Sequence, residues 1–107
     1  NSWLALQVLT LSAIFLLIVH VIEVQLWALC YLILPDVTEL TTFEEASYFS
    51  FITYTTVGFG DLILKPPWRI LAGIEALNGI LLAGWTTALL FAELQRTWEI
   101  ESEHRRK

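Results

Sequence analysis

Residues 55–61, Thr-Thr-Val-Gly-Phe-Gly-Asp, contain the chemistry that a dehydrated cation requires. Gly58 and Gly60 alternate with larger residues, and glycine adopts backbone conformations that are closed to other residues. Successive carbonyl groups can therefore point to one side, instead of alternating as they do in a strand. We predict that these carbonyl oxygens, together with the Thr56 hydroxyl, replace the hydration shell of a cation.

The apolar runs on either side of segment 55–61 predict the elements that hold it. One run predicts a helix over 3–34, ended by Pro35, and a second run predicts a helix over 68–98. At about 1.5 Å of rise per residue, each helix exceeds the ~30 Å hydrocarbon core of a bilayer. We therefore expect two transmembrane helices and a tail over 99–107. A secretory signal peptide fits the first run poorly, because the run is too long and starts without a positive charge.

A shorter helix is predicted immediately before segment 55–61. Residues 43–54 are rich in aromatic side chains, and Thr42 with Glu45 forms a capping-box pattern at their start. This stretch is too short to cross a bilayer, so we predict a re-entrant pore helix that protein surrounds at membrane depth. Its negative C-terminal end would stabilise a cation nearby. The expected fold class is all-α, with two transmembrane helices and a re-entrant pore helix in one pore domain over 1–107.

One chain supplies one row of carbonyl groups, whereas a cation needs a closed ring of them. Four copies around a shared axis would close the ring, so we predict a homotetramer in which each chain has three identical partners. Two spanning helices place both termini on one side of the membrane. The basic residues nearest the C-terminus are Arg96, Arg105, Arg106 and Lys107. They favour the cytoplasm for that side, which predicts a multi-pass protein of the cell membrane with both termini cytoplasmic.

Composition argues against several other classes of protein. The chain has 107 residues, of which 56% are hydrophobic, and a formal net charge of −5. It has no basic footprint for nucleic acid, and we expect membrane lipid as its surroundings instead. No nucleophile–base set is present, so an enzyme is not expected. The single Cys30 cannot form an intrachain disulfide and is expected in a packed position. Because the chain contains no Met, we expect a fragment or a processed form, which leaves open whether a flanking cytosolic regulatory domain is missing.

Segment 55–61 between two spanning helices resembles the two-helix class of potassium channels of prokaryotic type, in which each subunit is helix, pore helix, filter and helix. The resemblance covers nearly all of the chain, and Thr-Val-Gly-Phe-Gly-Asp is a specific match. It implies a K⁺-selective filter, with Thr55 in support and Asp61 at the outer mouth. The filter residues that it implies are Thr56, Val57, Gly58, Phe59 and Gly60, of which the first four would form the K⁺ sites. K⁺ is then the bound ion, and no organic cofactor is expected.

Two positions depart from the pattern of that class. Many members have Tyr in place of Phe59, and the tyrosine hydroxyl bonds to an aromatic residue of the pore helix. The matching residue here is Phe49, so both polar partners are absent and we expect Phe49 and Phe59 to form an apolar contact. Ile52 replaces a carboxylate of some relatives that pairs with the residue at Asp61. We predict that Tyr48 bonds to Asp61 instead and holds the outer filter open.

Four polar residues interrupt the predicted spanning helices, namely His20, Glu23, Glu75 and Asn78. Each pair is three residues apart on its helix, hence on one face, and antiparallel packing would bring the pairs to similar depth. We expect one cluster behind the pore helix, because ionisable residues at this depth are costly and default to functional roles. Three interpretations remain open: a hydrogen-bonded network that braces the filter, a site whose protonation modulates conduction, or a divalent metal site.

Glycines on the second predicted helix are candidates for a gating hinge. The resembling channels have a hinge glycine partway along this helix, and Gly79 lies one residue from that position, with Gly84 as a rival. Such glycines also serve as close-packing points between helices, and both interpretations remain open. We expect Leu81, Gly84 and Ala88 to line an apolar cavity below Thr56, which would permit a hydrophobic gate.

Other functions fit the residues less well. A Gly-x-Gly turn alone could cap a hairpin, but here it follows two threonines between spanning helices. A non-selective cation channel would be expected to alter residues 57–60, and a potassium transporter of this type joins four such units in one chain. A structural membrane subunit would have no need of the segment. For the gating stimulus, the sequence contains no arginine-repeat voltage sensor, Ca²⁺-binding loop or nucleotide-binding fold.

Overall fold

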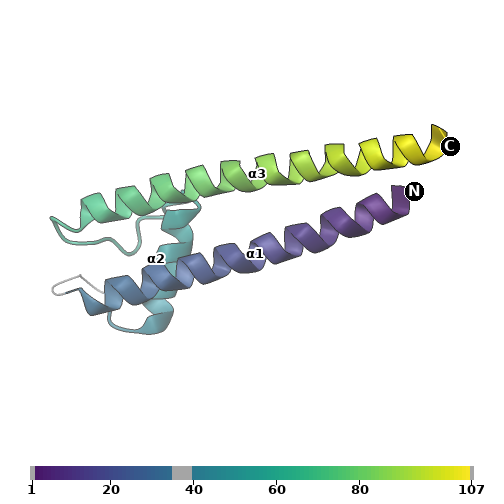
Figure 1. The fold of residues 1–107 in the computed structure, drawn as a ribbon. Coiled ribbons are helices and arrows are strands. Elements are labelled where there is room, and N and C mark those ends of the chain that lie inside the picture. The colour runs from purple at the N-terminus through teal and green to yellow at the C-terminus, as the bar shows by residue number, and fades with distance from the viewer. Residues whose placement is uncertain (1, 35–39, 107) are drawn as a thin grey trace.

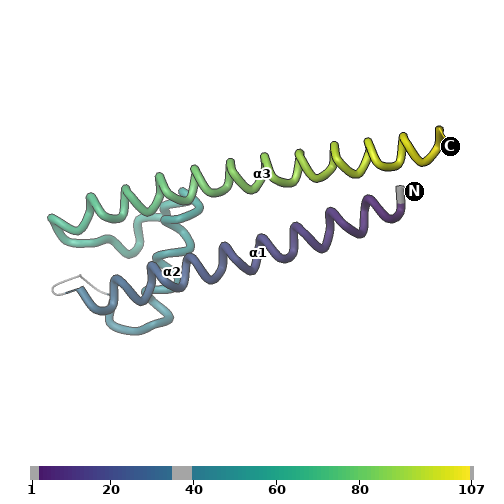
Figure 2. Tube along the Cα trace, in the orientation of Figure 1, coloured from purple at the N-terminus to yellow at the C-terminus, as the bar shows by residue number. Residues whose placement is uncertain are grey.

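The computed structural model describes residues 2–34 and 40–106, and all regular structure in these ranges is helical. Helix α1 spans Ser2–Ile33, α2 spans Phe43–Tyr54 and α3 spans Arg69–Arg106. The two long helices run antiparallel along a molecule of 65 × 21 × 21 Å (Figures 1 and 2). The short α2 lies across them at one end, and the start of α1 and the end of α3 lie together at the other (Figure 1).

Both long helices have the length and composition to cross a membrane. Helix α1 has 32 residues and α3 has 38, and large apolar side chains along both are exposed in the single chain. An exposed apolar surface of this extent needs lipid or protein to cover it, as expected of a membrane protein. Helix α1 matches its predicted bounds closely, whereas Pro35, the residue expected to end it, lies outside the described residues.

Helix α2 begins with the predicted capping box. The Thr42 hydroxyl accepts a hydrogen bond from the backbone N–H of Glu45 at 3.1 Å, and the Glu45 carboxylate accepts one from the Thr42 N–H at 3.2 Å. The same carboxylate accepts bonds from the backbone N–H and the hydroxyl of Thr41. These bonds hold the pKa of Glu45 below its usual value, with the Thr41 hydroxyl contributing most. The box therefore fixes where the short helix starts.

Helix α3 is longer than the sequence predicted. It continues to Arg106, whereas we expected the helix to end near residue 98 and a separate tail to occupy 99–107. No Gly or Pro interrupts residues 99–106, and strong helix formers dominate there. The last turn holds basic side chains, which interact favourably with the negative end of a helix. The described part of the expected tail is therefore the last turns of α3.

The buried core lies where the three helices meet. Its apolar cluster consists of Tyr31, Leu40, Phe49 and Leu64. Near the termini, the long helices are linked by the Ser12 hydroxyl, which donates to a Glu93 carboxylate oxygen at 2.7 Å. The core thus fixes α2 and the segment that follows it, at the end of the molecule away from the termini.

Candidate functional site

Segment 55–61 leaves the C-terminal end of α2 with an alternating backbone. The angle φ is positive at Thr56 (66°), Gly58 (57°) and Gly60 (82°), while Val57 and Phe59 are not in the left-handed region. Left-handed residues at every second position turn successive carbonyl groups toward one side. No signal in the sequence indicated this conformation at Thr56. It destabilises a non-glycine residue by roughly 1–2 kcal/mol, so the surrounding structure must hold it in place.

Besides the bonds that Thr55 and Thr56 make to the last turn of α2, two hydrogen bonds fasten the middle and the end of segment 55–61 to this helix. The backbone N–H of Gly58 donates to the Ile52 carbonyl at 2.9 Å. The Tyr48 hydroxyl donates to Asp61 Oδ2 at 2.7 Å, which confirms the predicted contact. That bond to Asp61 also raises the pKa of Tyr48. The segment is therefore held near its middle and at its end by residues one helical turn apart.

All seven residues of segment 55–61 are exposed in the single chain. The exposed fraction is 53% for Val57 and 70% for Phe59, which is high for apolar side chains beside a buried core. The other residues of the segment contribute backbone atoms and the side chains of Thr55, Thr56 and Asp61 to this surface. The face that these residues form is therefore open to a further protein surface.

Phe49 does not face Phe59 in this chain, so the expected contact between them is not formed here. Phe49 is 5% exposed and lies edge-on against Tyr31, with 5.4 Å between the ring centroids, whereas Phe59 is exposed. The reason lies in helix geometry, because neighbouring residues of α2 point about 100° apart. Tyr48 points to segment 55–61 at Asp61, so Phe49 points to α1 and the core.

The first polar network surrounds Glu75 and is fully buried. Glu75 is 0% exposed, and the Tyr31 hydroxyl donates to its Oε1 at 2.7 Å. The Ser50 hydroxyl contacts the other carboxylate oxygen and also lies 3.0 Å from the carbonyl oxygen of Val24. We call Tyr31, Ser50 and Glu75 the Glu75 network. It joins one residue from each helix at the depth of the core.

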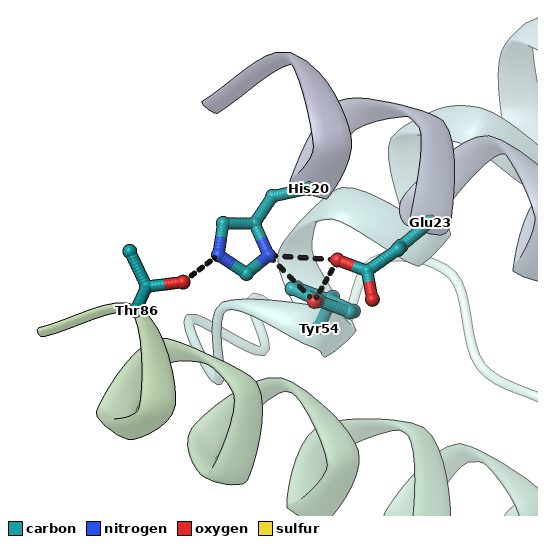
Figure 3. Close-up of polar contacts among 4 residues, drawn as sticks. All are labelled: His20, Glu23, Tyr54 and Thr86. Carbon is teal, nitrogen blue, oxygen red and sulfur yellow. Dashed lines mark hydrogen bonds and ion pairs between the residues drawn. The ribbon is translucent and has the colours of Figure 1, made fainter. Parts of the chain in front are cut away.

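The second polar network surrounds His20 at the C-terminal end of α2, where segment 55–61 begins (Figure 3). His20 Nδ1 lies 2.8 Å from Glu23 Oε1 and 3.0 Å from the Tyr54 hydroxyl, and Nε2 lies 2.6 Å from the Thr86 hydroxyl. The Tyr54 hydroxyl donates to Glu23 Oε1 at 3.2 Å. We call these four residues the His20 network. It also joins all three helices. The side chains of His20 and Glu23 are only partly buried, whereas Tyr54 is buried.

The sequence predicted one cluster, but the four residues are divided between the two networks. His20 and Glu23 are together, Glu75 belongs to the other network, and the Asn78 side chain makes no hydrogen bond among the described residues. Ser50 and Tyr54 lie four apart on one face of α2, and each reaches a different carboxylate.

The sequence alone did not indicate four residues of these networks. Tyr31, Ser50 and Tyr54 contact the carboxylates, and Thr86 contacts the His20 ring. The i, i+4 spacing of the two α2 residues was the signal available. Across the described ranges, no group of three His, Cys, Asp or Glu side chains could hold a metal, so the structure does not support the divalent metal interpretation.

The two hinge candidates differ in their surroundings. A Cβ atom added at Gly79 would overlap the Tyr54 carbonyl oxygen and lie 2.8 Å from its carbonyl carbon. At Gly84, a Cβ would meet nothing within 4 Å. Helix α3 passes through both positions without a break, so Gly79 is a close-packing point where α3 meets the end of α2. Leu81, Gly84 and Ala88 are exposed in the single chain, and their role in lining a cavity stays a prediction.

A cleft of about 510 Å³ connects the His20 network with segment 55–61. Its lining includes His20 and Tyr54 of the network, together with Thr55, Thr56 and Gly79. The inner end of the segment and the polar side chains behind it therefore share one solvent space in the single chain.

A protein-family model described as an ion channel matches residues 18–96. The matched range contains the second half of α1, all of α2, segment 55–61 and most of α3, and it includes every residue of both polar networks. No curated protein and no solved structure matches the chain.

Proposed function

The chain belongs to the ion channel family, and on that premise we propose that it is the pore-forming subunit of a potassium-selective channel. The observation that carries this proposal is the alternating backbone of segment 55–61, with positive φ at Thr56, Gly58 and Gly60. A row of carbonyl groups on one side can replace the hydration shell of K⁺. In this proposal Thr56, Val57, Gly58 and Phe59 supply the K⁺ sites.

We further propose that four identical chains surround the pore. Segment 55–61 is exposed and offers a single row of carbonyl groups, so it is incomplete as a binding site in one chain. A four-fold axis beside the segment would close the ring and cover Val57 and Phe59. The exposed Phe59 would then pack against a neighbouring subunit. In the cell membrane, both termini would lie on the cytoplasmic side.

The reversal potential of the purified channel in planar bilayers tests the proposal. With a high K⁺ concentration on one side of the bilayer, and most of the K⁺ replaced by Na⁺ on the other side, we expect a value close to the K⁺ equilibrium potential. A reversal potential near zero would indicate a non-selective cation channel and contradict the proposal. Gly58→Ala provides the test of the filter, because φ is +57° there, and Gly73→Ala is the matched control with open space around its Cβ. We expect Gly58→Ala to lose selectivity and Gly73→Ala to keep it.

The bond between Tyr48 and Asp61 gives a second test at the outer end of segment 55–61. The Tyr48 hydroxyl lies 2.7 Å from Asp61 Oδ2, and it restrains the residue that follows the last filter glycine. Tyr48→Phe removes the bond and keeps the ring. We expect currents of this variant to inactivate several-fold faster during sustained conduction, because one restraint on the outer end of the segment is lost in each subunit. Unchanged inactivation would show that the bond does not hold the outer filter open.

A further inference from the structure

We propose that His20 is a proton-responsive positioning residue for the inner end of segment 55–61, acting through Tyr54 and Thr86. The inference rests on the proposed function, because the response is measured as K⁺ current. His20 is on α1, Tyr54 is the last residue of α2, and Thr86 is on α3 (Figure 3). A single imidazole ring therefore contacts all three helices at the point where segment 55–61 begins.

The hydrogen bonds determine which ring nitrogen carries the proton in the neutral state. Glu23 as a carboxylate can only accept, and its Oε1 is 2.8 Å from His20 Nδ1. The Tyr54 hydroxyl already donates to the same Oε1, so its oxygen is also an acceptor toward Nδ1. Nδ1 therefore carries the hydrogen, which leaves a lone pair on Nε2. The Thr86 hydroxyl, 2.6 Å away, donates to that lone pair.

Protonation of His20 reverses the bond to Thr86. Nε2 then carries a hydrogen and donates to the Thr86 oxygen, so the Thr86 hydroxyl hydrogen must find another acceptor. On α3, the hydroxyls of Thr87 and Thr97 donate to carbonyl oxygens four residues back, those of Ala83 and Glu93. The corresponding acceptor for Thr86 is the Leu82 carbonyl. A bond of this kind to the helix's own backbone bends the helix slightly, so the proton on His20 alters α3.

The same protonation acts on the inner end of segment 55–61. His20 shares a cleft of about 510 Å³ with Thr55 and Thr56, so a positive charge on the ring acts on any cation there. Tyr54 carries the effect through the chain, because its hydroxyl contacts His20 and its carbonyl packs against Gly79. A shift of the Tyr54 ring therefore changes the position of Thr55 and Thr56, which immediately follow it in the chain.

The charged and titratable groups around His20 come from two of the three helices. On α1, Glu23 faces Nδ1, and on α2 the Tyr54 hydroxyl does. The group on α3 that contacts the ring is Thr86, which does not titrate in this range. The buried carboxylate of α3, Glu75, is engaged by Tyr31 and Ser50 and acts on Tyr54 only at longer range. Histidine is a side chain whose charge ordinarily changes between pH 5 and 8. The His20→Asn variant separates its contribution to the pH response from that of Glu75.

The test is a pH titration of K⁺ current through the reconstituted full chain, with both sides of the bilayer varied together. We expect the current to fall by about threefold or more from pH 8 to pH 5.5, because each subunit gains a positive charge beside the pore. The chain has two histidines, which provide a matched pair of variants. His20→Asn should remove the pH dependence. His104→Asn, on the exposed last turn of α3, should retain it.

A second pair of variants addresses the bond to α3 and covers the case in which His20→Asn fails to assemble. Thr86→Ser keeps the hydroxyl and should keep the pH response, whereas Thr86→Val keeps the shape and should weaken it. The tautomer is measured independently by ¹⁵N NMR of histidine-labelled His104→Asn protein in nanodiscs. We expect the neutral His20 ring to carry its hydrogen on Nδ1.

The outcomes separate this inference from the proposed function. A K⁺-selective current with no pH dependence, or one whose pH dependence survives in His20→Asn, would overturn the inference and leave the proposed function standing. A neutral ring with its hydrogen on Nε2 would also overturn it. A chain that carries no K⁺-selective current at any pH would overturn both.

Discussion

The Glu75 network and the His20 network use the same chemistry in different surroundings. In each, a tyrosine hydroxyl donates to a glutamate on a long helix: Tyr31 to Glu75 at 2.7 Å, and Tyr54 to Glu23 at 3.2 Å. Glu75 is 0% exposed, whereas 27% of the Glu23 side chain is exposed. The Glu75 carboxylate bonds to hydroxyl groups inside the core, whereas the Glu23 carboxylate contacts a histidine, a residue that can change its charge.

The difference in burial separates a structural role from an adjustable one. A buried hydrogen-bonded carboxylate is costly to disturb, because its partners cannot turn to water when it is removed. A partly exposed network can exchange partners and protons at lower cost. We therefore expect substitutions around Glu75 to change stability, and those around Glu23 to change mainly the response of the channel. The following substitutions test this contrast.

The largest effect is expected from Glu75→Leu. This change keeps the volume of the side chain but leaves the Tyr31 hydroxyl without its acceptor and removes one from Ser50. We expect the assembled protein to lose about 2–4 kcal/mol of stability, measured by thermal unfolding in detergent. Glu75→Gln, which can still accept a bond from Tyr31, is the control and should lose less than half as much. Equal losses in the two variants would mean that hydrogen bonding to Glu75 does not brace the fold.

The next effect is expected at Gly79, which lies between the two networks. Gly79→Ala places a Cβ against the Tyr54 carbonyl, so α3 must move away from the end of α2. We expect a loss of about 1–3 kcal/mol in thermal stability, typical of overpacking at a close contact. Gly84→Ala is the matched control, because its Cβ meets nothing and alanine favours a helix by about 1 kcal/mol over glycine. A hinge at Gly79 would instead appear as altered gating with unchanged stability.

Local signals in the sequence predicted most of the fold. The capping box of Thr42 and Glu45 placed the start of α2, and continuous apolar runs placed the two long helices. The bond between Tyr48 and Asp61 was predictable because Asp61 ends segment 55–61 and Tyr48 lies on the helix that precedes this segment. The end of α3 was missed, since residues 99–106 are polar but still favour a helix.

The division of the polar residues into two networks could not be predicted from the spacing on the long helices alone. Counting residues along α1 and α3 gives depth, but it ignores the helix that crosses between them. Ser50 and Tyr54 project from α2 at two depths, and each carboxylate bonds to the nearer one. The positive φ of Thr56 was hidden for a related reason, because only the assembled surroundings hold a non-glycine residue in that conformation.

Removing one hydroxyl from each network compares the networks directly. Tyr31→Phe leaves the fully buried Glu75 with one donor fewer, and we expect a loss of about 1–3 kcal/mol in thermal stability. Tyr54→Phe should lose less than about 1 kcal/mol, because Glu23 keeps its bond to His20 and can reach water. The pH dependence of current should change only in the second variant. Equal stability losses would contradict the distinction that burial draws between the two networks.

The smallest effect is expected at Glu45, an exposed carboxylate that extends the comparison beyond the two networks. Hydrogen bonds from Thr41 and Thr42 lower its pKa in the folded protein from the ordinary value of 4.5. The stability that these bonds contribute is therefore present above pH 4.5 and is lost as the pH falls through the lowered value. Thermal unfolding between pH 3 and 6 should show a decline in the wild-type protein that Glu45→Gln lacks, while Glu44→Gln, its neighbour, behaves as wild type. Because Glu45 lies at the start of α2 and far along the helix from Tyr54, its titration should leave the proposed K⁺ selectivity unchanged. A change in selectivity would mean that the cap is coupled to segment 55–61.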